Sequence, residues 1–204
     1  MSNARHSAQN LLTNLLMYPL AFLGSIVISR LLGAEGRGVY VYIVLICNFF
    51  LPYICMGFNA GILYNIGTGK YGLRETYFAI IISALGFAVP YVSLVFIANK
   101  FGLLGVSSPY ITPLILGLII MIIPINMIYN FLSKAILAES LFSLDNIIRI
   151  TTKVVTPLSI IIMILIFKND IQAAIFAIFL TALLIQIILH TYIITLSSPS
   201  FNRL

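Results

Sequence analysis

The sequence predicts an all-α membrane protein, a single transmembrane domain (residues 1–204) built as a bundle of six membrane-spanning helices. Of the 204 residues, 61% are hydrophobic and only 8% are charged, and the mean hydropathy is +1.13. Soluble domains have roughly 25% charged residues, so this chain has too few charges to cover a surface that faces water. Its apolar residues also occur in long runs, as transmembrane helices require.

The apolar runs have the length that crosses a bilayer. A helix needs about 20 apolar residues to cross a hydrocarbon core roughly 30 Å thick. The runs lack the alternation of polar and apolar residues that is typical of outer-membrane barrels, which favours helices. The predicted spans are Leu11–Leu32, Gly38–Leu63, Tyr77–Ala98, Tyr110–Phe131, Ile147–Phe167 and Ile171–Leu196.

The segments between these runs are predicted to be loops. Glycine and charge at 33–38 indicate a tight turn between the first two spans, and 67–72 is a second glycine-rich connection. Residues 100–109 form a longer loop, and 168–170 form a minimal hairpin. Residues 133–145 carry leucine and isoleucine on one side, so we expect a helical continuation outside the hydrocarbon core.

The basic residues predict the orientation of the chain. Six crossings place both termini on one side of the membrane. That side holds seven of the Lys and Arg residues and the other holds four, which favours cytoplasmic termini. The seven are Arg5, Lys70, Arg74, Lys134, Arg149, Lys153 and Arg203, and the four are Arg30, Arg37, Lys100 and Lys168.

Two pairs of basic residues are candidate ligand contacts. Arg149 and Lys153 are four residues apart and share one helix face, with Asp145 a turn earlier as a possible partner of Arg149. Arg30 and Arg37 flank the first glycine-rich turn. Each pair has two interpretations: an anchor that reaches the lipid head groups, or a cationic site for a phosphate-bearing ligand.

Prolines at positions 19, 52, 124 and 157 fall in four different spans. Proline bends a helix, so these positions suit either a bundle that bends around an internal cavity or simple packing irregularity. The sequence shows no pattern typical of a catalytic site, a metal site, a cofactor or nucleic-acid binding. We therefore expect a protein that is not an enzyme, whose partners include membrane lipid.

The stretch Ile28–Tyr40, with the sequence ISRLLGAEGRGVY, resembles the first hairpin of bacterial polysaccharide flippases. These belong to the multidrug/oligosaccharidyl-lipid/polysaccharide exporter superfamily. Weaker similarities lie at Gly57–Leu63 and Phe142–Arg149. Members of the family have about twice as many spans, so the chain resembles their N-terminal six-helix half, one lobe of a two-lobe exporter.

The resemblance implies a lobe that flips undecaprenyl-diphosphate-linked oligosaccharide across the bacterial cytoplasmic membrane during surface polysaccharide biosynthesis. It implies diphosphate contacts at Arg30 and Arg37, and a hydrated cavity lined by groups such as Asn48 and Asn126. The implied partners are the lipid-linked glycan and a second six-helix lobe, or further copies of the chain. The alternative is a non-transporting scaffold, or a truncated remnant, that packs against partner helices.

Overall fold

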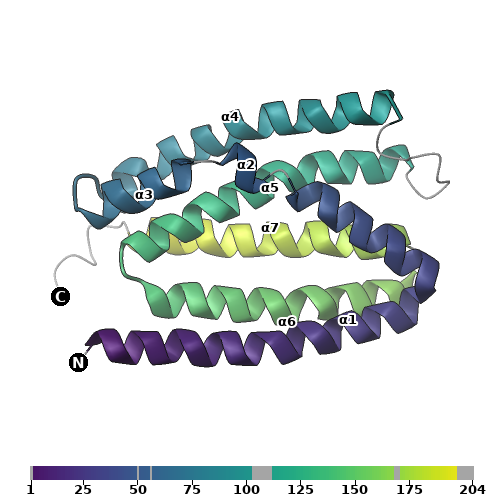
Figure 1. The fold of residues 1–204 in the computed structure, drawn as a ribbon, viewed down its shortest axis with the longest axis horizontal. Helices are drawn as coiled ribbons and strands as arrows, with labels where there is room; N and C mark the ends of the chain where they lie inside the picture. Colours follow the sequence, from purple (N-terminus) through teal and green to yellow (C-terminus); the bar gives the residue numbers. More distant parts are fainter. Residues whose placement is uncertain (1, 50, 56, 103–111, 168–170, 197–204) are drawn as a thin grey trace. The chain divides into compact units, whose positions relative to one another are not determined.

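The computed structural model describes residues 2–49, 51–55, 57–102, 112–167 and 171–196. Every regular element in these ranges is an α-helix, as the sequence predicts, and long helices make up most of the chain (Figure 1). The helices are α1 (Ser2–Asn48), α2 (Leu51–Ile54), α3 (Phe58–Gly67), α4 (Leu73–Lys100), α5 (Pro113–Ala138), α6 (Phe142–Ile166) and α7 (Ile171–Leu196).

Within the described ranges, five helical segments are long and apolar enough to cross a membrane. They are Ala21–Ile54, Glu75–Lys100, Pro113–Ala138, Phe142–Ile166 and Ile171–Ile193. The predicted multi-pass membrane protein is thereby confirmed. The count of six spans is not confirmed, because the first two predicted spans share one long segment.

Helix α1 joins the first predicted span to the start of the second. Its 47 residues correspond to about 70 Å of α-helix, more than twice the thickness of a hydrocarbon core. Gly33 interrupts the helix with φ 69° and ψ −178°, a backbone region that essentially only glycine adopts. The chain bends there (Figure 1), so the turn predicted over 33–38 is a single hinge residue followed directly by helix.

The predicted span Gly38–Leu63 is not one continuous helix. Helix α1 ends at Asn48, the four-residue α2 follows, and α3 begins only at Phe58. Pro52 lies in α2, and Gly57 precedes α3 with a positive φ of 79°. Proline lacks a backbone donor and glycine reaches positive φ without strain, so both residues favour a break in the helix here.

The remaining predicted spans match helices closely. The predictions 77–98 and 147–167 fall on α4 and α6, and 171–196 coincides with α7. Helix α5 begins three residues later than predicted and runs on to Ala138, so the helical continuation expected from 133 is confirmed up to that residue. Ser140, with φ 61°, separates α5 from α6. The predicted loop at 103–109 and hairpin at 168–170 lie outside the described residues.

The chain divides into two compact units, and the single domain stays a prediction. The first unit comprises Met1–Val44 and Leu141–Thr181; the second comprises Leu45–Ser140 and Ala182–Leu204. In the first unit, Leu32 and Tyr40, on either side of the Gly33 hinge, pack against the same buried cluster. That cluster consists of Ile28, Ile160, Ile164, Ala174 and Ala177.

The second unit is held by aromatic and hydrogen-bonded contacts among α3, α4 and α5. The rings of Phe58 and Phe131 lie 4.7 Å apart, and Phe87 of α4 contacts both. The Leu73 amide at the start of α4 donates to the Glu139 carboxylate just after α5, at 3.1 Å. The turn between α3 and α4 therefore lies beside the C-terminal end of α5.

Candidate functional site

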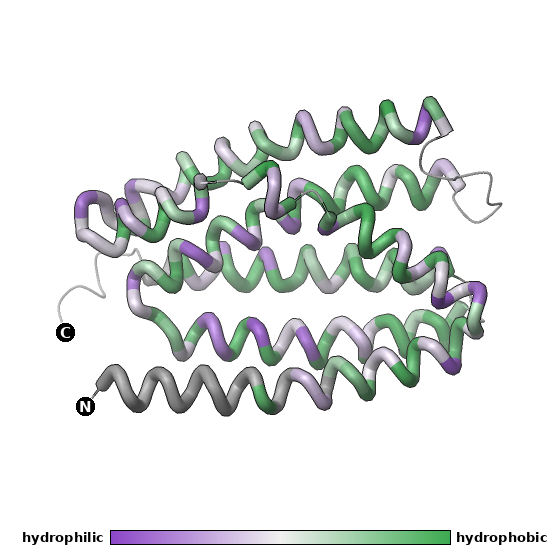
Figure 2. Tube along the Cα trace, in the orientation of Figure 1, coloured by the Kyte–Doolittle hydropathy of each residue, from purple (hydrophilic) through white to green (hydrophobic). Residues whose placement is uncertain are grey.

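A row of polar side chains runs along α6 from its first turn to beyond its middle. Figure 2 shows hydrophilic positions spaced along the N-terminal part of α6 and a mainly hydrophobic C-terminal end. Their spacing of three or four residues puts them on one side of the helix. We call this the α6 polar face, and it consists of Asp145, Arg149, Thr152, Lys153, Thr156 and Ser159.

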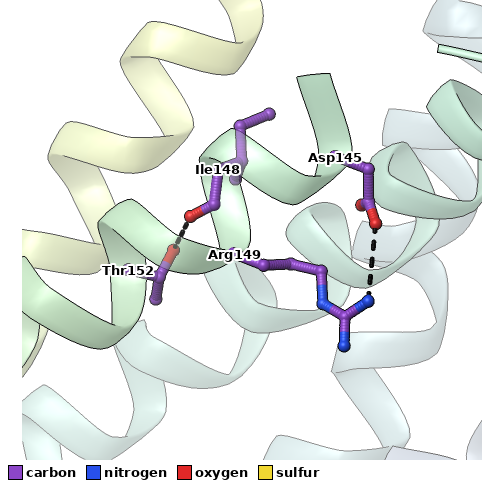
Figure 3. A network of polar contacts seen from close by, with 4 residues as sticks. All are labelled: Asp145, Ile148, Arg149 and Thr152. Atoms are coloured by element: carbon purple, nitrogen blue, oxygen red, sulfur yellow. Dashed lines mark hydrogen bonds and ion pairs between the residues drawn. The ribbon is translucent and has the colours of Figure 1, made fainter. Parts of the chain in front are cut away.

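The face begins with an ion pair. Arg149 Nη1 lies 3.8 Å from Asp145 Oδ2, one helical turn away, which confirms the predicted pairing (Figure 3). The two partners differ in exposure: 4% of the Asp145 side chain is exposed against 40% for Arg149. The carboxylate is thus buried, and the positive N-terminal end of α6 also favours it. The guanidinium is the more exposed partner.

The hydroxyl groups of the face are partly satisfied by the helix itself. Thr152 Oγ1 donates to the Ile148 carbonyl at 2.7 Å (Figure 3), and Ser159 Oγ donates to the Thr156 carbonyl at 2.8 Å. Such back-bonding satisfies each hydroxyl proton within the helix. The oxygen lone pairs remain able to accept hydrogen bonds from water or a ligand.

Lys153 is the exposed cation of this face. It is the twelfth of the 25 residues of α6, so it lies near the middle of a helix that is long and apolar enough to cross a membrane. Within the described part of the chain it makes no ion pair. The α6 polar face therefore presents uncompensated positive charge well inside a candidate span.

The arginines of α1 lie in the same unit as the α6 polar face. Arg30 and Arg37 are both exposed and stand on either side of the Gly33 hinge. Arg37 Nη2 donates to Ser25 Oγ at 3.4 Å, so its side chain reaches back across the hinge toward the first arm of α1. The first unit thus holds all four basic residues that the sequence singles out.

The two predicted asparagines belong to the second unit. Asn48 is exposed at the end of α1, immediately before the break that precedes α2. Asn126 is half-buried in α5. The structure therefore divides the six predicted site residues between the units, with four cations in the first and two amides in the second.

Sequence reasoning missed a polar network in the second unit. The Tyr77 hydroxyl of α4 contacts His190 Nδ1 of α7, and His190 Nε2 lies 2.9 Å from Gln186 Nε2. The sequence alone does not single out His190 as part of a network. Gln186 lies four residues before His190 on the same helix, so helical spacing could have indicated this part of the network. Tyr77 is 113 residues from His190 along the chain, so sequence spacing could not indicate that contact.

Comparison with models of known protein families, with curated proteins and with solved structures finds no match for this chain.

Proposed function

We propose that the chain is one lobe of a transporter that flips undecaprenyl-diphosphate-linked oligosaccharide across the bacterial cytoplasmic membrane. Positive charge exposed within a candidate span, on the α6 polar face, is the observation that carries this proposal. Transport of a diphosphate-linked lipid requires cations at membrane depth, because the diphosphate cannot enter hydrocarbon without neutralisation. Lys153 supplies one such charge, and Arg149, which is paired with Asp145, lies one helical turn before it.

Energetics favour a water-filled or ligand-filled space beside α6. A lysine or arginine at the centre of a membrane helix costs about 2.5–3.5 kcal/mol on insertion scales. A helix with two cations and several hydroxyls on one side lowers this cost by turning that side toward water, a partner or an anionic ligand. Structural anchoring at the head groups, the simpler interpretation, fits Lys153 poorly because it is the twelfth residue of the helix.

The proposal includes six crossings with cytoplasmic termini. The first crossing runs along α1 up to the Gly33 hinge, and the second runs through the rest of α1, α2 and α3, with Arg30 and Arg37 at the turn on the outer side. Support comes from the hinge itself and from the resemblance of Ile28–Tyr40 to the first hairpin of polysaccharide flippases. By that resemblance, Arg30 and Arg37 contact the diphosphate, and a second lobe or a second copy of the chain completes the cavity.

Binding of undecaprenyl diphosphate to the purified protein tests the cationic site. The ligand is expected to raise the temperature of thermal unfolding in detergent, whereas uncharged undecaprenol is not. Arg149→Gln and Lys153→Gln are each expected to weaken binding roughly tenfold or more, because a hydrogen bond to a charged group contributes about 1.5–3 kcal/mol. Lys100→Gln, which removes a cation at the end of α4, is the matched control.

Two outcomes would contradict the proposal. Equal stabilisation by undecaprenyl diphosphate and undecaprenol would mean that the cations do not recognise the diphosphate. Unchanged binding in both α6 variants would place the anionic group elsewhere. Reconstitution into vesicles, with the glycan detected from outside by a lectin, then separates a transporting protein from a scaffold that binds lipid but moves none.

A further inference from the structure

A groove of about 520 Å³ lies between α3 and α4 in the second unit. Two glycines of the α3 side, Gly57 and Gly61, help to form it. A Cβ atom added at either position would meet nothing within 4 Å. The groove exists because these positions carry no side chain next to the facing residues of α4.

The two ends of the groove differ in chemistry. Asn65, Tyr71 and Thr76 line the end nearest the α3–α4 turn. Phe58 and Phe87 line the other end, where their rings are 5.4 Å apart. The groove thus has a polar mouth and an aromatic end, and apolar side chains such as Ile80 line its length.

The length of the groove matches one leaflet of a bilayer. From Thr76 to Phe87 the helix rises about 16 Å, which is close to half of a hydrocarbon core roughly 30 Å thick. Thr76 lies one residue inside the candidate span that begins at Glu75. A hydrocarbon chain whose head group is at the membrane surface would therefore reach the aromatic end near the bilayer centre.

A lysine, Lys70, lies beside Tyr71 at the mouth. The amides of Lys70 and Tyr71 both donate to the Asn65 carbonyl, at 3.1 and 3.3 Å. The Lys70 ammonium lies 5.5 Å from the centre of the Tyr71 ring. The neighbouring carboxylates of Glu75 and Glu139 accept from the amides that start α4, and Lys70 makes no ion pair within the described ranges.

We propose that this groove is a binding site for one anionic phospholipid. One acyl chain fills the space between α3 and α4, and the phosphate lies against Lys70 at the polar mouth. Any groove on a membrane-embedded surface is in contact with acyl chains. The Lys70 cation and a length that matches one leaflet are what make this groove selective for one anionic phospholipid. The site is separate from the α6 polar face and does not depend on the proposed transport function.

Native mass spectrometry of the purified protein, with phosphatidylglycerol or phosphatidylcholine of identical acyl chains, tests the site. The unmodified protein is expected to hold one phosphatidylglycerol at least five times more often than one phosphatidylcholine. Gly61→Leu fills the groove and should lower the bound fraction of both lipids. Ala79→Phe narrows it from the α4 side and serves as a second blocking variant.

Two further variants separate the contributions. Gly86→Leu adds the same side chain on α4 where a Cβ also meets open space, and it should bind lipid like the unmodified protein. Lys70→Gln should keep acyl-chain binding but make the two lipids bind equally. The site is refuted if folded Gly61→Leu and Ala79→Phe retain the original phosphatidylglycerol occupancy, or if the unmodified protein does not distinguish the two lipids.

Discussion

Replacing Gly33 by alanine tests the hinge at which α1 turns between the first two proposed crossings. The residue sits at φ 69° and ψ −178°, and a non-glycine residue in such a region costs about 1–3 kcal/mol. The added Cβ itself would meet nothing within 4 Å, so the cost arises only from the backbone. Straightening α1 would instead separate Leu32 and Tyr40 from their shared cluster.

Gly38→Ala is the matched control for this prediction. Gly38 lies in the same helix, its added Cβ also meets open space, and its φ is not positive. Alanine there should be neutral or stabilising by up to about 1 kcal/mol. Thermal unfolding in detergent, followed by circular dichroism, should give a lower midpoint for Gly33→Ala than for Gly38→Ala. Equal midpoints, or a more stable Gly33→Ala protein, would refute the hinge.

Two further predictions concern packing within each unit. Gly24→Val should destabilise the first unit by about 1–3 kcal/mol, since an added Cβ would lie 3.0 Å from Pro157 Cβ; Gly86→Val, in open space, should change the unfolding midpoint little. Tyr91→Phe should cost about 1–3 kcal/mol, because the buried Tyr91 hydroxyl donates to the Ile46 carbonyl. An unchanged midpoint in either variant would show that the contact contributes nothing to stability.

The sequence predicted the long helices well because apolar runs of membrane length have few alternative structures. The helices α4, α6 and α7 begin and end within a few residues of their predicted bounds. The predictions failed at glycine and proline. Charged residues on both sides of Gly33 indicated a loop, and hydropathy does not distinguish a loop from a one-residue hinge. Hydropathy also does not distinguish a continuous span from one that is broken between Asn48 and Phe58, because the residues on both sides of this break are mostly apolar.

The candidate site was predictable only where its residues are neighbours in sequence. The Asp145–Arg149 pair follows from helical spacing and is confirmed. The α3–α4 groove and the Tyr77–His190 contact depend on residues brought together by tertiary packing. A sequence pattern carries no signal for an absent side chain that leaves a groove, so the sequence does not single out Gly61.

The most direct test of the six-crossing account is labelling of single cysteines from one face of sealed membrane vesicles. Glu35→Cys, Lys70→Cys and Lys134→Cys, each in a protein whose native Cys47 and Cys55 are replaced by alanine, provide the sites. We predict that an impermeant thiol reagent reaches positions 70 and 134 from one face and position 35 only from the other. Labelling of positions 35 and 70 from the same face would contradict the account, because the segment between them would then not cross the membrane.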